Sequence, residues 1–271
     1  MILKVGALPG RVGVHASSAV VRGRIVTDLA TICENWIRRF HPAPGDGTRL
    51  VVLPHAGGSA SFYFPLSRAL APRFDVPAVQ YPGCQVRLAE PCIDDIGELA
   101  DRIAAVLQPW TCEPPAFFGH SMGALVAFEV ARRLDVEPIQ LFVSGRRAPS
   151  WYRDERVHQR NGEGLVAELR KLSGTASWVL GDEELLRVVL PAVRSDYRAV
   201  ETYGCAPGAK VGCPITVLVG DADPKVTLDE VEAWREHTEA EADVRVFSGG
   251  HFFMTERQDE VLAVITGGSL R

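Results

Sequence analysis

The residues best suited to chemistry are five consecutive ones near the middle of the chain, Gly119-His120-Ser121-Met122-Gly123. The apolar run AFF precedes them, and ALVAFEVARRL, a run rich in helix formers, follows. A G-x-S-x-G motif between a strand and a helix is typical of a sharp reversal in which the serine hydroxyl projects above a sheet. Small residues two positions away on either side let the strand and the helix pack closely. The motif therefore predicts that Ser121 is a nucleophile.

A serine hydroxyl is a poor nucleophile until a general base takes its proton. Of the seven histidines, His251 has the most suitable position, because it lies in a loop after the last predicted strand. The acid that orients this histidine is expected after the preceding strand, where the chain offers Asp221 and Asp223. We favour Asp223, which lies deeper in the loop, and Asp221 is then a turn or cap residue.

Two backbone N–H groups are expected to bind the negative charge that develops on the carbonyl oxygen of the substrate. The N–H of Met122, the residue after the nucleophile, is one of them. The loop 55–58, which reads HAGG and follows the first core strand, supplies the other, and we assign it to Ala56. These groups together predict acyl transfer to a serine, followed by hydrolysis of the acyl-enzyme.

The strands that must position these residues are short apolar or β-branched runs without polar alternation. Such strands are covered on both faces, which is typical of a parallel sheet with helices on both sides. A capping-box pair, Thr227 and Glu230, marks the start of one of the helical patterns between them. The sequence therefore predicts an α/β fold of the α/β-hydrolase kind, with a mostly parallel central sheet flanked by helices. The predicted strands are 50–53, 76–81, 116–119, 141–144, 215–220 and 244–247. One helical pattern has apolar residues at helical spacing, Ile96, Leu99, Ile103, Val106 and Leu107, and another runs over 122–134.

About seventy residues separate the predicted strands 141–144 and 215–220, far more than one crossover helix requires. Two amphipathic helical patterns lie in this interval, and Pro191 is expected to kink or end the second. We predict an inserted helical lid at about residues 149–208, folded over the carboxyl edge of the sheet.

The first part of the chain has no clear periodicity and is rich in glycine. We therefore expect residues 1–33 to be a loosely ordered N-terminal extension. Residues 34–271 are expected to form the catalytic domain.

Composition excludes several other classes of function. The 271 residues carry 29 Lys and Arg against 34 Asp and Glu, a formal net charge of −5, and 46% are hydrophobic. This balance disfavours a nucleic-acid partner, which requires a basic patch. The longest uncharged stretch, 50–67, is interrupted by proline and glycine, so no membrane-spanning helix is expected. The six cysteines form no C-x-x-C pair; we expect no metal, no cofactor, and a monomeric protein with reduced thiols in the cytoplasm.

Seven segments resemble the type II thioesterases, free-standing α/β-hydrolases that serve modular polyketide and nonribosomal peptide assembly lines. The resemblance covers the chain from about residue 34 to its end, and the segments occur in the order of the family. They are WIRRFHP (36–42), LPHAGGSA (53–60), QYPG (80–83), FFGHSMGALVAFE (117–129), VSGRRAP (143–149), GDADPK (220–225) and SGGHFF (248–253).

The resemblance implies that Ser121, Asp223 and His251 form a catalytic triad and that the insertion is a mobile lid. It also implies an editing role, in which stalled or wrong acyl groups are hydrolysed from the phosphopantetheine arm of acyl or peptidyl carrier proteins. A general serine carboxylesterase acting on small acyl esters would share the same triad, and it is the alternative function.

Arg146 and Arg147 follow a core strand, towards the face where the site is expected to open. They are candidates to contact the phosphopantetheine phosphate or the acidic surface of a carrier protein. Ion pairs that brace the lid are the alternative role for both side chains.

Overall fold

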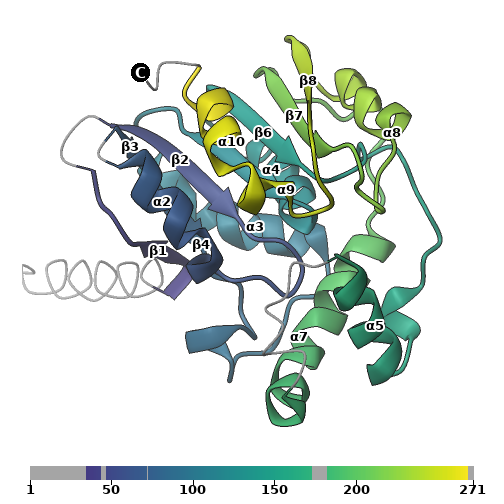
Figure 1. The fold of residues 1–271 in the computed structure, drawn as a ribbon. Helices are drawn as coiled ribbons and strands as arrows, with labels where there is room; N and C mark the ends of the chain where they lie inside the picture. Colours follow the sequence, from purple (N-terminus) through teal and green to yellow (C-terminus); the bar gives the residue numbers. More distant parts are fainter. Residues whose placement is uncertain (1–34, 44–46, 72, 173–181, 268–271) are drawn as a thin grey trace, which may run out of the picture.

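The central strands of the sheet are short runs buried on both faces, whereas the edge strand at Ala242–Phe247, which was expected to be covered in the same way, is largely exposed. The computed structural model describes residues 35–43, 47–71, 73–172 and 182–267. Within these ranges the strands run in the order β1-β4-β2-β5-β6-β7-β8, with β3 paired to β2, and only β1 is antiparallel to its neighbour. The predicted mostly parallel α/β sheet is confirmed (Figure 1). The strands are β1 (Ile37–Arg39), β2 (Thr48–Leu53), β3 (Phe74–Asp75), β4 (Pro77–Val79), β5 (Ala116–His120), β6 (Gln140–Ser144), β7 (Ile215–Gly220) and β8 (Ala242–Phe247).

Helices cover both faces of the sheet (Figure 1). Phe117 and Phe118 are neighbours on β5, so their side chains point to opposite faces, and each joins a different hydrophobic cluster. The cluster around Phe117 contains the buried faces of α3 (Ile96–Leu107) and α4 (Met122–Ala131); the one around Phe118 contains those of α2 (Phe64–Leu70) and α10 (Gln258–Ile265). The shorter helices α8 (Leu228–Glu232) and α9 (Phe253–Glu256) follow β7 and β8.

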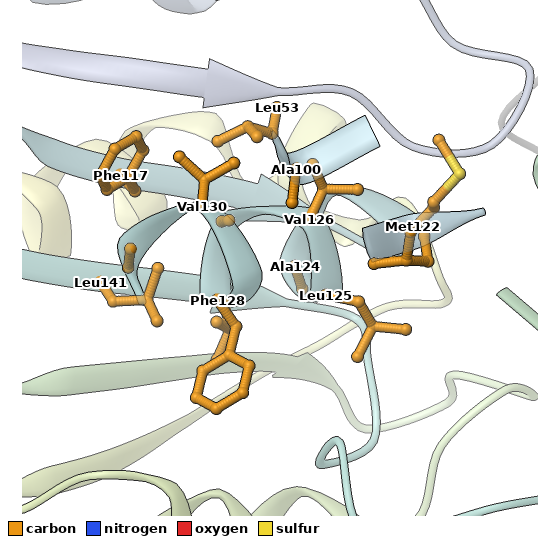
Figure 2. Close-up of a cluster of buried hydrophobic side chains, with 14 of the residues drawn as sticks. Leu53, Ala100, Phe117, Met122, Ala124, Leu125, Val126, Phe128, Val130 and Leu141 are labelled. Carbon is orange, nitrogen blue, oxygen red and sulfur yellow. The ribbon is translucent and has the colours of Figure 1, made fainter. Parts of the chain in front are cut away.

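Helix α4, which begins directly after Ser121, is buried along its whole length. Figure 2 shows its side chains packed against Leu53, Phe117 and Leu141, which come from β2, β5 and β6. This environment explains why the sequence of the helix is apolar on every side rather than on one stripe. A helix held in this way fixes the position of the residue at its amino end.

The close approach of α4 to the sheet depends on Gly119 and Gly123. A Cβ at Gly119 would overlap the backbone of Gly123, and a Cβ at Gly123 would overlap the carbonyl oxygen of Leu53. The turn therefore admits only glycine at these two positions.

The interval between β6 and β7 contains α5 (Gly162–Leu172) and α7 (Glu183–Thr202). These helices lie beyond the carboxyl ends of the strands (Figure 1) and share a small cluster that includes Val157, Leu165 and Tyr197. Pro191 lies inside α7, which continues past it to Thr202. Residues 1–33, the expected extension, lie outside the described residues. No helix in the described ranges is both long and apolar enough to span a bilayer.

We predict that Gly123→Ala lowers the free energy of unfolding by at least about 2 kcal/mol, because the added methyl group must displace backbone rather than a side chain. Urea unfolding monitored by tryptophan fluorescence measures this change. Gly204→Ala is the matched control, since a Cβ at Gly204 meets nothing within 4 Å. Equal stability of the two variants would contradict the account of the turn.

Candidate active site

Ser121 has a backbone conformation that few residues other than glycine adopt. Its φ is 55° and its ψ is −116°, in the turn between β5 and α4. Its N–H donates to the carbonyl oxygen of Ser144 at the end of β6, at 2.8 Å. The side chain makes no capping hydrogen bond to the helix that it precedes. The hydroxyl is thus held at the carboxyl edge of the sheet and left available for chemistry.

His251 and Asp223 form a buried pair beside this serine. The Nδ1 atom of His251 lies 2.8 and 3.0 Å from the two carboxylate oxygens of Asp223. Their side chains are only 1% and 0% exposed. Because a carboxylate can only accept hydrogen bonds, Nδ1 is the nitrogen that carries the proton in the neutral ring, and Nε2 then has a free lone pair. This is the tautomer that a general base for a serine requires.

Asp221, the other candidate acid, has a different set of contacts. Its side chain accepts a hydrogen bond from the N–H of Gly249 at 2.9 Å, and its own N–H donates to the carbonyl oxygen of Phe247 at 2.8 Å. The residue is exposed and ties the loop after β7 to the loop after β8. It therefore helps to hold the two loops that carry Asp223 and His251 in register.

Two further histidines, His55 and His120, lie against the site and are neutral. Burial, together with the neighbouring His251, lowers the pKa of His55 to about 3 and that of His120 well below its ordinary value. Their Nδ1 atoms lie 3.4 Å from the hydroxyl of Tyr63 and 3.0 Å from that of Ser144. Neither has a carboxylate partner in the described part of the chain, so neither is set up as the base.

The loop after β2 and the start of α4 present N–H groups to the same space. Met122 is the first residue of α4, so its N–H has no partner within the helix. In the loop, the N–H of Gly57 donates to Asp196 at 2.7 Å and that of Gly58 to the carbonyl oxygen of His55 at 2.9 Å. The N–H of Ala56 has no such bond to any described residue. Ala56 lines a narrow cavity of about 30 Å³ together with Ser121 and His251.

Asp196, on helix α7 of the insertion, is a site residue that the sequence analysis missed. It is 6% exposed, and its hydrogen bond to Gly57 joins the insertion to the loop that contains Ala56. Burial raises the pKa of this carboxyl to about 7, although the bond from Gly57 works in the opposite direction. Nothing in the sequence marks it, because its partner lies 139 positions away.

Lys225 makes a second connection between the insertion and the site. Its N–H donates to Asp223 at 2.8 Å, and its Nζ lies 2.9 Å from Glu155 and 3.0 Å from Glu168 on α5. Burial by itself would raise the pKa of Glu155, but hydrogen bonds and charge from Lys225 and Arg147 lower it to about 2. Charged groups therefore hold the insertion to the loop after β7, which carries Asp223 and is called the acid loop below.

The two arginines singled out from the sequence have different environments. Arg147 pairs with Glu155 at 2.8 Å and donates to the carbonyl oxygen of Lys225 at 3.3 Å. Arg146 lines the narrow cavity beside Ser121, and no ion pair joins it to any residue that the structure describes. No group of three or more potential metal ligands occurs among the described residues either.

Similar proteins are found by sequence. The model of the Thioesterase domain family matches residues 48–267. The probable cadicidin biosynthesis thioesterase of Streptomyces griseus is 53% identical over 87% of this chain and 66% of its own length. Thioesterase PikA5 of Streptomyces venezuelae is 53% identical over 83% of this chain and 82% of its own length.

Solved structures agree with these sequence matches. The type II thioesterase BorB from the borrelidin biosynthetic cluster has a TM-score of 0.81 and 51% identity, covering 86% of this chain and 97% of that chain. The RedJ thioesterase from the prodiginine pathway of Streptomyces coelicolor has a TM-score of 0.79 and 36% identity, covering 84% of this chain and 93% of that chain.

We predict that Asp196→Asn flattens the pH dependence of stability. As the pH rises, the unfolded chain releases the proton of this carboxyl near pH 4, whereas the folded chain retains it until about pH 7. The buried acid therefore makes the wild type progressively less stable between these pH values, by up to about 4 kcal/mol, and the amide removes this loss. Urea unfolding over that pH range measures it.

Asp229→Asn, at an exposed position of α8, is the matched control and should leave the slope unchanged. If the wild type and Asp196→Asn lose stability in parallel as the pH rises, the buried carboxyl does not titrate as described.

Proposed function

Because this chain belongs to the Thioesterase domain family, as a type II thioesterase of polyketide or nonribosomal peptide biosynthesis, we propose that it removes acyl groups from carrier proteins by a serine mechanism. Its substrates are aberrant or stalled acyl groups on the phosphopantetheine arm of acyl or peptidyl carrier proteins. The observation that supports the proposal is the buried pair of His251 and Asp223, in which His251 lines the same narrow cavity as Ser121 on its strained turn.

In the first step, the hydroxyl oxygen of Ser121 attacks the thioester carbonyl carbon while Nε2 of His251 takes its proton. Asp223 accepts from Nδ1 and stabilises the imidazolium that forms. The N–H groups of Ala56 and Met122 bind the oxyanion of the tetrahedral intermediate. One such donor is worth about 3 kcal/mol of transition-state stabilisation.

Collapse of this intermediate breaks the carbon–sulfur bond and leaves the acyl group on Ser121. A thiol with a pKa of about 8.5 is a good leaving group. Protonation of the leaving sulfur by His251 therefore contributes less here than protonation of the leaving oxygen does in the cleavage of an oxygen ester. A water molecule then attacks the acyl-enzyme, again with His251 as base. The products are the free acid and the carrier protein with its thiol restored.

The insertion acts in this scheme as a lid. Asp196 and Lys225 join it to the loop of Ala56 and to the acid loop, so its position is coupled to the geometry of the reacting groups. The ion pair with Glu155 favours a bracing role for Arg147, while Arg146 is left available to the substrate. We place the reaction in the cytoplasm, with a monomeric enzyme and a carrier protein as its partner.

We predict that Ser121→Ala abolishes release of the acyl group from an acylated carrier protein, with a loss of at least about 10³-fold in kcat/KM. The assay follows the appearance of the free carrier thiol. Substantial residual turnover in this variant would remove the serine from the mechanism.

The two aspartates after β7 provide a matched pair for the same assay. Asp223→Ala is expected to lower kcat by about 10²- to 10⁴-fold, because the imidazole loses its orientation and its charge partner. Asp221→Ala, which removes a loop contact, should retain most of the activity. The reverse order would identify Asp221 as the acid.

A comparison of leaving groups separates this function from that of a general carboxylesterase. The proposed enzyme should hydrolyse acyl-pantetheine thioesters faster than oxygen esters of the same acyl group, and carrier-bound thioesters faster still. A preference for small oxygen esters would favour the carboxylesterase.

A further inference from the structure

The N–H of Ala56 belongs to a peptide unit whose two neighbouring units are both held by side chains. On the preceding unit, the carbonyl oxygen of Pro54 accepts a hydrogen bond from the hydroxyl of Tyr81 at 3.1 Å. On the following unit, the N–H of Gly57 donates to a carboxylate oxygen of Asp196 at 2.7 Å. Because peptide units are planar, fixing both neighbours limits the directions in which the N–H of Ala56 can point.

The same peptide unit is also bonded within its own loop. Its carbonyl oxygen, that of His55, accepts from the N–H of Gly58 at 2.9 Å and closes a tight turn. The three bonds around this unit therefore come from three parts of the molecule. Tyr81 belongs to the segment after β4, Gly58 to the loop itself, and Asp196 to helix α7 of the insertion.

Helix α7 is packed against the loop at Gly57 as well as bonded to it. Val193 lies one turn before Asp196 and on the same face of the helix. A Cβ at Gly57 would lie only 2.8 Å from Cγ2 of Val193, so backbone and helix meet closely there. Asp196 is itself buried, and a hydrogen bond in such surroundings is stronger than one in water. The bond is therefore suited to fix the position of Gly57.

We propose, on the basis of the serine mechanism set out above, that Asp196 is a positioning residue for the oxyanion hole, which sets the direction of the Ala56 N–H from the insertion. Helix α7 thereby completes the hole. The other donor, the N–H of Met122, is held by α4 and the core, so Asp196 acts on one donor of the two. Alignment of a donor matters, because a displacement of about 1 Å in an active site can cost about 10²-fold in rate.

The effect of Asp196 on the reaction passes through the loop. Ala56 lines the narrow cavity together with Ser121 and His251, whereas Asp196 does not line it. The role does not require the charge of the carboxylate either, because a protonated carboxyl keeps an oxygen that can accept from the N–H of Gly57. An amide oxygen can accept the same bond. These properties define the substitutions that test the role.

Two substitutions of nearly equal shape separate the acceptor from the volume that it fills. Asp196→Asn keeps an oxygen for the N–H of Gly57, and Asp196→Leu has none. We expect Asp196→Leu to lower kcat for an acyl-pantetheine thioester roughly 10- to 100-fold, with KM within about 2-fold of the wild type, and Asp196→Asn to retain most of the activity. Both acylation and deacylation form an oxyanion, so kcat falls whichever step limits it.

Three results of this assay would overturn the proposal: an unchanged kcat in Asp196→Leu, a change confined to KM, or an equal loss in Asp196→Asn. A change confined to KM would mean that Asp196 only anchors the insertion. Where Asp196→Leu does not fold, as judged by circular dichroism, Asp196→Ala takes its place, since it removes the acceptor without adding a branched side chain.

Asp94→Asn is the matched control, because it breaks a different contact of the same helix. The exposed ion pair between Asp94 and Arg198, at 2.9 Å, joins α7 to the segment before α3. Exposed pairs of this kind contribute little to stability, so we expect kcat within about 2-fold of the wild type. A loss as large as that in Asp196→Leu would assign the effect to general loosening of α7 and overturn the proposal.

A transition-state analogue gives a measurement that a purely structural role would not change. When a trifluoromethyl ketone replaces the thioester, the oxygen of Ser121 bonds to the carbonyl carbon. The carbonyl π electrons move to its oxygen, which becomes an oxyanion, and His251 takes the serine proton. The unfluorinated ketone of the same shape binds without this charge. We expect Asp196→Leu to raise the Ki of the fluorinated ketone roughly 10- to 100-fold and that of the other by less than about 2-fold. Equal weakening of both ketones would overturn the proposal.

Failure of this proposal is distinguishable from failure of the function on which it rests. Full activity in Asp196→Leu, with Ser121→Ala inactive, would remove the positioning role and leave the serine hydrolase intact. Full activity in Ser121→Ala would remove the function itself.

Discussion

The close approach of helix α4 to the sheet is the constraint on which the site depends. Gly119 and Gly123 allow backbone to meet backbone across this contact, on either side of the turn from strand to helix. Ser121 takes up the strain, with a φ of 55°. The apolar packing around α4 stabilises this arrangement, because the helix cannot shift without breaking the core. The strained turn that carries the proposed nucleophile is thus tied to the tight packing at the centre of the protein.

The insertion contacts the site through both apolar and polar groups. Ala56 packs against its apolar cluster, and Leu169 and Val200 line the narrow cavity. Asp196, Glu155 and Glu168 add hydrogen bonds and ion pairs to the loop of Ala56 and to Lys225. Apolar contacts exclude water without fixing a direction, whereas the hydrogen bonds and ion pairs define one position of the insertion relative to the site.

The local pattern of apolar and polar residues was sufficient to predict most of the fold. Strands that are buried on both faces stand out as unbroken apolar runs, and α3 contains all the residues whose helical spacing predicted it. β1 and β3 were not predicted, since they have three and two residues and depend on pairing with strands that come from elsewhere in the chain. Helix α4 ends at Ala131, earlier than the apolar pattern indicates.

The residues of the candidate site also differ in whether a local sequence pattern could predict them. The motif around Ser121 is local, and the positions of Asp223 and His251 follow from the order of strands. Asp196 and the partner of Arg147 could not be found in this way, because each contact joins side chains that only the folded chain brings together. Arg146 was singled out from its position after β6, but the burial of its Nε without a hydrogen-bond partner among the described residues depends on its three-dimensional surroundings.

Asp221 joins the loop after β7, which carries Asp223, to the loop after β8, which carries His251. These contacts limit the motion of the two loops relative to each other. β7 and β8 are adjacent, and besides the bond between His251 and Asp223, Asp221 makes two hydrogen bonds across to the end of β8 and the loop beyond it, and Ala222 makes one. The carboxylate and the imidazole thus belong to one rigid corner of the molecule. In the proposed mechanism, the acid and the base that it orients are therefore held together by contacts that do not involve the insertion.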